Sequence, residues 1–150
     1  MEGKSLEDLF RGRGLDIPQM LNRLKSVARD EGLPFGDRKM TFNSNRAQEL
    51  AKFARDEGKE NEFHHAVFKA YFVDGLNIAD HDVLIQCMET SGMNARKGIE
   101  ALEKRTYRPL VKADWKHSAE AEIQAVPSFL YNGKLLTGAH PYETMAKLLT

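Results

Sequence analysis

Cysteine is scarce in this chain: Cys87 is the only one among its 150 residues. One thiol cannot form an internal disulfide, and dithiol exchange needs a second thiol beside the first. A lone cysteine next to Leu84 and Met88 in a helical pattern is typical of a small core residue. The sequence therefore predicts no dithiol chemistry by this chain alone, and we assign it no catalytic residue and no cofactor.

Net charge and long apolar runs are also missing. The 22 Lys and Arg residues balance 22 Asp and Glu residues, so no net field attracts nucleic acid or an anionic membrane. No apolar segment approaches the roughly 20 residues of a membrane span, and the first five residues lack the apolar run of a secretion signal. We therefore expect a cytoplasmic protein with neither a nucleic-acid partner nor a membrane partner.

Motifs for metals and nucleotides are absent as well. His64 and His65 are adjacent on a predicted helix, so they point about 100° apart and face one metal poorly. The other histidines are scattered along the chain, at His81, His117 and His140. No Cys/His spacing suggests zinc, so we expect no metal site. The segment 12–14 (Gly-Arg-Gly) lacks the third glycine and the preceding strand of a nucleotide-binding loop.

What is present is mostly helix with clear start signals. Apolar residues recur at helical spacing and predict helices over residues 16–32, 44–58, 60–74, 80–92 and 106–121, with another starting at Asn94. Residues 33–42 contain Pro34 and Gly36 and are expected to be extended or irregular. Short loops and the absence of repeats favour a single unit. The helix predicted over residues 60–74 carries a stripe of aromatic residues, Phe63, Phe68, Tyr71 and Phe72. Such a stripe is usually core and occasionally lines a ligand pocket.

The last thirty residues change to the pattern of a β-hairpin. Apolar segments lie on both sides of Asn132-Gly133, the dipeptide that best supplies two positive φ angles for a two-residue turn. Pro127 opens the first of the two strands, where its missing N–H removes no central ladder bond. A short amphipathic helix follows the second strand. The sequence therefore predicts a hairpin followed by a helix that docks on it.

From Leu15 to Leu149 the chain resembles the DsbA-like thioredoxin superfamily. It is most similar to the FrnE-type dithiol-disulfide isomerases, and more distantly to the branch of hydroxychromene-carboxylate isomerases and kappa-class glutathione transferases. The matching segments are Asn43–Ala47, Phe68–Asp80, Val126–Phe129 and Gly138–Pro141. The resemblance implies an α-rich α/β chain with a partial thioredoxin-like fold. It would be one truncated domain over residues 1–150, with a helical insertion at 15–121 and the C-terminal half of the thioredoxin fold at 122–150.

The same resemblance implies a binding loop and an exposed strand. Val126 and Pro127 would form the cis-proline loop, which binds an extended peptide or glutathione. Family members begin with a strand, a Cys-x-x-Cys helix and a second strand, and these elements are absent before the segment that aligns with residues 2–5. The missing first strand would flank the strand of Ser128, Phe129, Leu130 and Tyr131. Because an exposed apolar edge tends to pair, we expect a homodimer through these residues, or exchange of the hairpin between copies.

Three functional hypotheses follow, and whether this chain is an enzyme stays open among them. The first is a self-associating binding protein that has no thiol redox activity by itself. The second is a disulfide oxidoreductase or isomerase whose missing N-terminal unit comes from another polypeptide or was lost to a mis-assigned start codon. The third is a relative of the glutathione-dependent isomerases.

Overall fold

The computed structural model describes residues 3–149, which divide into two compact units. The first unit ends at Val111 and the second begins at Lys112. The single truncated domain with a division between residues 121 and 122 stays a prediction. Among the described residues, no helix combines the length and the apolar character that crossing a bilayer requires. The cytoplasmic location stays a prediction too.

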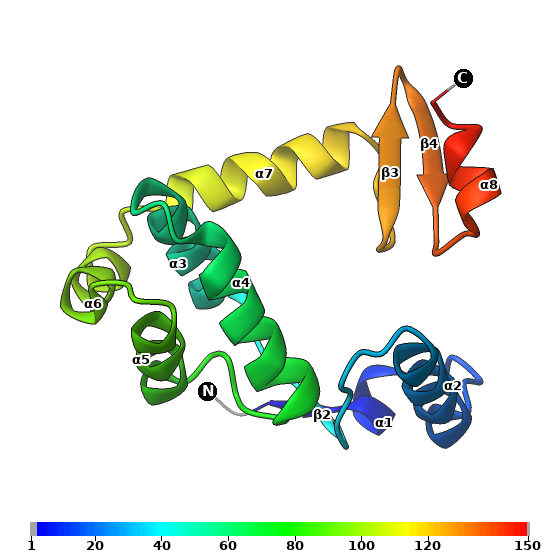
Figure 1. The fold of residues 1–150 in the computed structure, drawn as a ribbon, viewed down its shortest axis with the longest axis horizontal. Coiled ribbons are helices and arrows are strands. Elements are labelled where there is room, and N and C mark those ends of the chain that lie inside the picture. The colour runs from blue at the N-terminus through cyan, green and yellow to red at the C-terminus, as the bar shows by residue number, and fades with distance from the viewer. Residues whose placement is uncertain (1–2, 150) are drawn as a thin grey trace. The chain divides into compact units, whose positions relative to one another are not determined.

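The first unit is helical, with two very short strands (Figure 1). In chain order its elements are β1 (Lys4–Ser5), α1 (Leu6–Leu9), α2 (Ile17–Asp30), β2 (Met40–Thr41), α3 (Asn45–Asp56), α4 (Glu60–Phe68), the π-helical η1 (Lys69–Val73), α5 (His81–Thr90), α6 (Ala95–Glu103) and the start of α7 (Arg108–Glu120). Helix starts follow the predicted signals, because the side chains of Asp16, Asp80 and Asn94 each accept backbone N–H bonds from the first turn of α2, α5 and α6. Ser44 precedes α3 without a side-chain cap bond.

The structure differs from the sequence prediction at three places in the first unit. The helix predicted over residues 60–74 is not uniform, since α4 gives way to η1, where the Asp74 N–H donates to the Lys69 carbonyl at 3.0 Å. The antiparallel pairing of β1 with β2 was not predicted. Helix α7 begins at Arg108, two residues after the predicted start.

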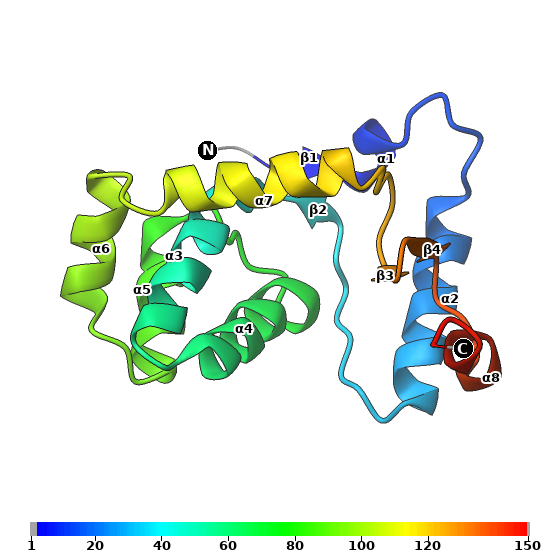
Figure 2. The same ribbon diagram turned by 90° about the horizontal axis from the view of Figure 1, so that it is seen from above.

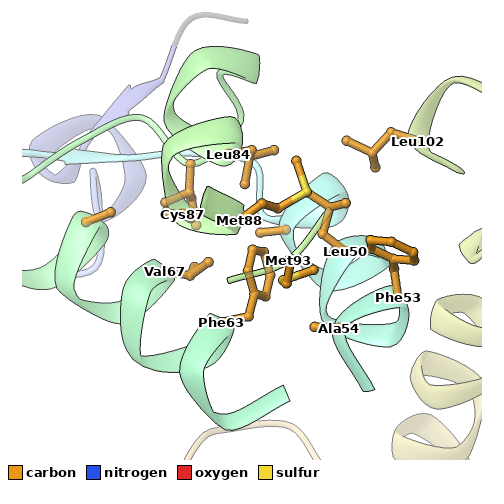
Figure 3. Close-up of a cluster of buried hydrophobic side chains, with 13 residues drawn as sticks. Leu50, Phe53, Ala54, Phe63, Val67, Leu84, Cys87, Met88, Met93 and Leu102 are labelled. Atoms are coloured by element: carbon orange, nitrogen blue, oxygen red, sulfur yellow. The ribbon is translucent and has the colours of Figure 1, made fainter. Parts of the chain in front are cut away.

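The core of the first unit lies among α3, α4, α5 and α6, which pack together in both ribbon views (Figure 2). Its largest completely buried side chains come from three helices and are labelled in Figure 3: Leu50 from α3, Phe63 from α4, and Leu84 and Met88 from α5. Gly98 lets α6 approach α5 closely: a Cβ at this position would lie 2.2 Å from the Met88 Sδ atom. A larger residue therefore does not fit here without repacking.

The second unit contains the rest of α7 and the predicted hairpin. Strand β3 (Ser128–Tyr131) pairs antiparallel with β4 (Lys134–Thr137), and α8 (Tyr142–Ala146) follows. Asn132 and Gly133 have φ angles of 48° and 75°, so the predicted two-residue turn is confirmed. The chain is a helix-rich α/β protein with a small hairpin near its C-terminus, as the sequence predicts.

Candidate functional site

The candidate site is the outer edge of β3, and the register of the hairpin determines which backbone groups it exposes. In an antiparallel pair, residues that bond across the ladder alternate with residues whose N–H and C=O point away. Tyr131 and Lys134 flank the two-residue turn, and the Gly138 N–H donates to the Pro127 carbonyl at 2.8 Å. Residues 127, 129 and 131 therefore face β4. The backbone groups of Ser128 and Leu130 point away from it, toward the outer edge.

Side-chain contacts agree with this assignment. The Oγ atoms of Ser128 and Thr137 lie 3.4 Å apart, as expected where two opposite residues form the closely spaced pair without ladder hydrogen bonds. Leu130 and Leu135 form the next such pair. Their side chains are 48% and 41% exposed, so both project from the hairpin with similar access to solvent.

The two edges of the hairpin are not equivalent. Among residues 3–149, the sheet that contains β3 has only β4 as a second strand. On the β4 edge, the outward Thr137 carbonyl accepts a hydrogen bond from the His140 ring Nε2 at 2.9 Å. Outside the ladder, no backbone bond of the described residues involves Ser128 or Leu130. The β3 edge is therefore the more open one. The role of His140 was not predicted, because nothing in the sequence shows that its ring turns back on the strand.

The loop before β3 is exposed and ordered by short contacts. The peptide bond between Val126 and Pro127 is cis, and the Val126 side chain is 90% exposed. The Ser128 hydroxyl donates to the Ala125 carbonyl at 2.7 Å, which ties the start of β3 to the loop. Peptide or glutathione binding by Val126 and Pro127 stays a prediction.

An apolar groove runs beside the open edge. It is an open space of about 560 Å³ between β3 and the C-terminal helix region. Its lining includes Leu130 and Tyr131 from β3, and Tyr142, which is 81% exposed, from α8. Exposed apolar surface that adjoins unpaired backbone groups is typical of a place where another strand binds.

Cys87 is a buried core residue and is not placed to act as a nucleophile. It belongs to α5, is 5% exposed and packs in the core near Val67 and Met88 (Figure 3). Burial raises the pKa of the Cys87 thiol, and the Asp74 carboxylate raises that pKa further. The reactive form of cysteine is the thiolate, so Cys87 is held in its unreactive form. Its predicted place as a core residue is confirmed.

Comparison with a family model shows the family of the chain. A model of the DSBA-like thioredoxin domain matches residues 13–150. The uncharacterized protein YwbO of Bacillus subtilis is 33% identical over 99 residues, which are 65% of this chain and 50% of YwbO. The ClpXP adapter protein SpxH of Halalkalibacterium halodurans is 22% identical over 85 residues, which are 52% of this chain and 28% of SpxH. The chain thus matches half or less of the length of these relatives.

A solved structure supports the same fold. The crystal structure of the probable DsbA oxidoreductase SCO1869 from Streptomyces coelicolor superposes with a TM-score of 0.86 at 22% sequence identity. The match covers 99% of this chain and 67% of SCO1869. At this identity the likeness establishes the fold alone.

Proposed function

The chain belongs to the DSBA-like thioredoxin domain family, as the resemblance of four of its segments indicated, and we propose that it is a binding protein that pairs an extended strand with the open edge of β3. The observation that carries this proposal is the outward direction of the Ser128 and Leu130 backbone groups. The family is related to disulfide oxidoreductases, but this chain has one buried cysteine and cannot by itself exchange a dithiol for a disulfide. Assignment to the FrnE branch stays a prediction.

The strand that we propose for this edge is β3 of a second copy. A two-fold axis through Phe129 would place Ser128 of each copy opposite Leu130 of the other. Each such pair exchanges two backbone bonds, so the interface would gain about four hydrogen bonds and a four-stranded sheet. A two-stranded hairpin is marginal in water, whereas a wider sheet with an apolar face is stable. Self-association therefore stabilises the second unit.

The test is the oligomeric state of the chain and of two matched proline variants. Leu130→Pro removes an N–H that points outward from β3, and Leu135→Pro removes the equivalent N–H from β4. Neither N–H takes part in the β3–β4 ladder, so both variants can keep the hairpin. We expect sedimentation velocity to show a dimer for the wild type and for Leu135→Pro, and a monomer for Leu130→Pro. A wild type that stays monomeric at all concentrations, or a dimeric Leu130→Pro, would contradict the proposal.

A second candidate function is disulfide exchange with the catalytic thiols on a segment outside this chain. It is favoured by the match of nearly the whole chain to two thirds of a DsbA oxidoreductase. In that case the β3 edge would pair with a strand of that segment. The in-frame sequence upstream of the Met1 codon separates the two candidates, since a Cys-x-x-Cys there supports the second. For the chain alone, we expect insulin reduction no faster than for the Cys87→Ser variant.

A further inference from the structure

The β4 edge of the hairpin directs the same kinds of backbone groups outward as the β3 edge. Lys134 and Leu136 bond across the ladder to β3, so the N–H and C=O groups of Leu135 and Thr137 point away from it. The Leu135 side chain is 41% exposed, and an exposed apolar strand edge tends to pair with another strand. By its backbone and its apolar residues, this edge is therefore suited to bind a further strand.

One side chain lies over the β4 edge. Gly138 has a φ of 103°, a left-handed value that favours glycine, and the chain turns back after β4. His140 follows, and its ring Nε2 lies 2.9 Å from the Thr137 carbonyl oxygen. Since a carbonyl only accepts, Nε2 carries the proton and donates it. A ladder bond has the same length, so the ring nitrogen takes the position that the backbone nitrogen of a neighbouring strand would take.

We propose that His140 closes the β4 edge, which without this ring would bind β4 of a second copy. A two-fold axis through Leu136 would place Leu135 of each copy opposite Thr137 of the other. Four backbone hydrogen bonds would form, and two of them need the Thr137 carbonyls that the His140 rings occupy. Neighbouring strands lie about 4.7–4.9 Å apart, which leaves no room for an imidazole ring between them.

Charge does not protect this edge in the same way. Lys134 begins β4, and lysine on an edge strand often prevents pairing. In the symmetric pair, however, Lys134 would lie opposite Gly138 of the other copy and not opposite a second lysine. His140 is therefore the residue that keeps the β4 edge closed. The consequence that assembly stops at two copies rests on the proposed pairing of β3, whereas the closure of β4 does not.

The test measures β4 pairing by sedimentation velocity in the Leu130→Pro variant, whose β3 edge is disabled. Adding His140→Ala should double the mass, because it removes the ring and frees the Thr137 carbonyl. Adding Leu135→Pro as well should reverse the doubling, since it removes an outward N–H of β4. The matched control is His117→Ala, which removes an exposed histidine from α7 and should leave the mass unchanged.

The otherwise wild-type chain separates this inference from the proposed function. There His140→Ala should form species larger than the dimer, because each copy then has two edges that pair. If the wild type stays monomeric and His140→Ala gives a dimer that Leu135→Pro abolishes, the pairing of β3 is wrong and the closure of β4 is correct. The closure is wrong if His140→Ala leaves the mass unchanged in both backgrounds, if Leu135→Pro does not reverse its effect, or if His117→Ala has the same effect.

Discussion

Replacing Gly98 by alanine tests the close approach of α5 and α6 that organises the core. The new methyl carbon would lie 2.2 Å from the Met88 Sδ atom and 3.3 Å from Leu50 Cδ2. Optimal contacts between such atoms are about 3.5–4.0 Å, so the overlap with sulfur is well over 1 Å. Met88 is completely buried and must repack, which typically costs about 1–3 kcal/mol. Replacing glycine by alanine within a helix stabilises the helix by about 1 kcal/mol, which offsets part of this cost. We expect a net loss of about 1 kcal/mol.

Urea unfolding followed by far-UV circular dichroism measures this loss of stability. Glu100→Ala and Glu100→Gly give the helix-propensity difference alone, because both remove the same exposed ion pair on α6. Met88→Val removes the sulfur, so its combination with Gly98→Ala should lose less stability than the sum of the two single changes, by about 1 kcal/mol. The free energy of unfolding of Glu100→Ala minus that of Glu100→Gly gives the gain from helix propensity. If Gly98→Ala stabilises the chain by this same amount, the two helices do not approach as described.

Two further predictions concern titratable groups. Cys87 should react with an aromatic disulfide reagent only as fast as the core opens, because burial raises the pKa of its thiol; denaturant should accelerate the reaction, and rapid labelling of the native chain would contradict this. The hydrogen bond from the Tyr107 hydroxyl to Asp56 raises the pKa of Tyr107 above its ordinary value near 10. Its stabilising effect is present below that value and is lost as pH rises through the higher folded pKa. The urea midpoints of wild type and Tyr107→Phe should therefore converge in alkaline buffer, and a constant difference would refute the assignment.

The helix caps and the hairpin turn could be predicted from the sequence, because each depends only on residues close together in the chain. Asp16, Asp80 and Asn94 cap helices because a short side-chain oxygen satisfies N–H groups two or three residues ahead. The Asn132-Gly133 turn follows from two positive φ angles in adjacent residues. Neither depends on distant parts of the chain, so the sequence alone suffices.

Three other features of the fold could not be predicted from the sequence. Strands β1 and β2 contribute two residues each, too few to show an alternating pattern. The π-helical turn of η1 differs from an α-turn by one residue per hydrogen bond, which leaves no mark on apolar spacing. Glu49 is 2% exposed and accepts a hydrogen bond from Arg105 at 2.6 Å, across 56 positions of sequence. A charged residue in a helix is normally read as exposed, so this pair was missed.

The β3 edge shows why a partner is harder to predict than the need for one. Backbone hydrogen bonds along a strand are the same for every sequence, so the unpaired groups of Ser128 and Leu130 indicate a partner without naming it. The identity of the partner depends on the side chains that meet between β3 and the partner strand. A second copy would set Phe129 against its own equivalent and Leu130 against Ser128, whereas a foreign strand has no such symmetry. If pairing of the Leu130→Pro variant is restored only when wild-type chain is added, the partner is a second copy of the chain. Only a symmetric interface contains the same edge twice.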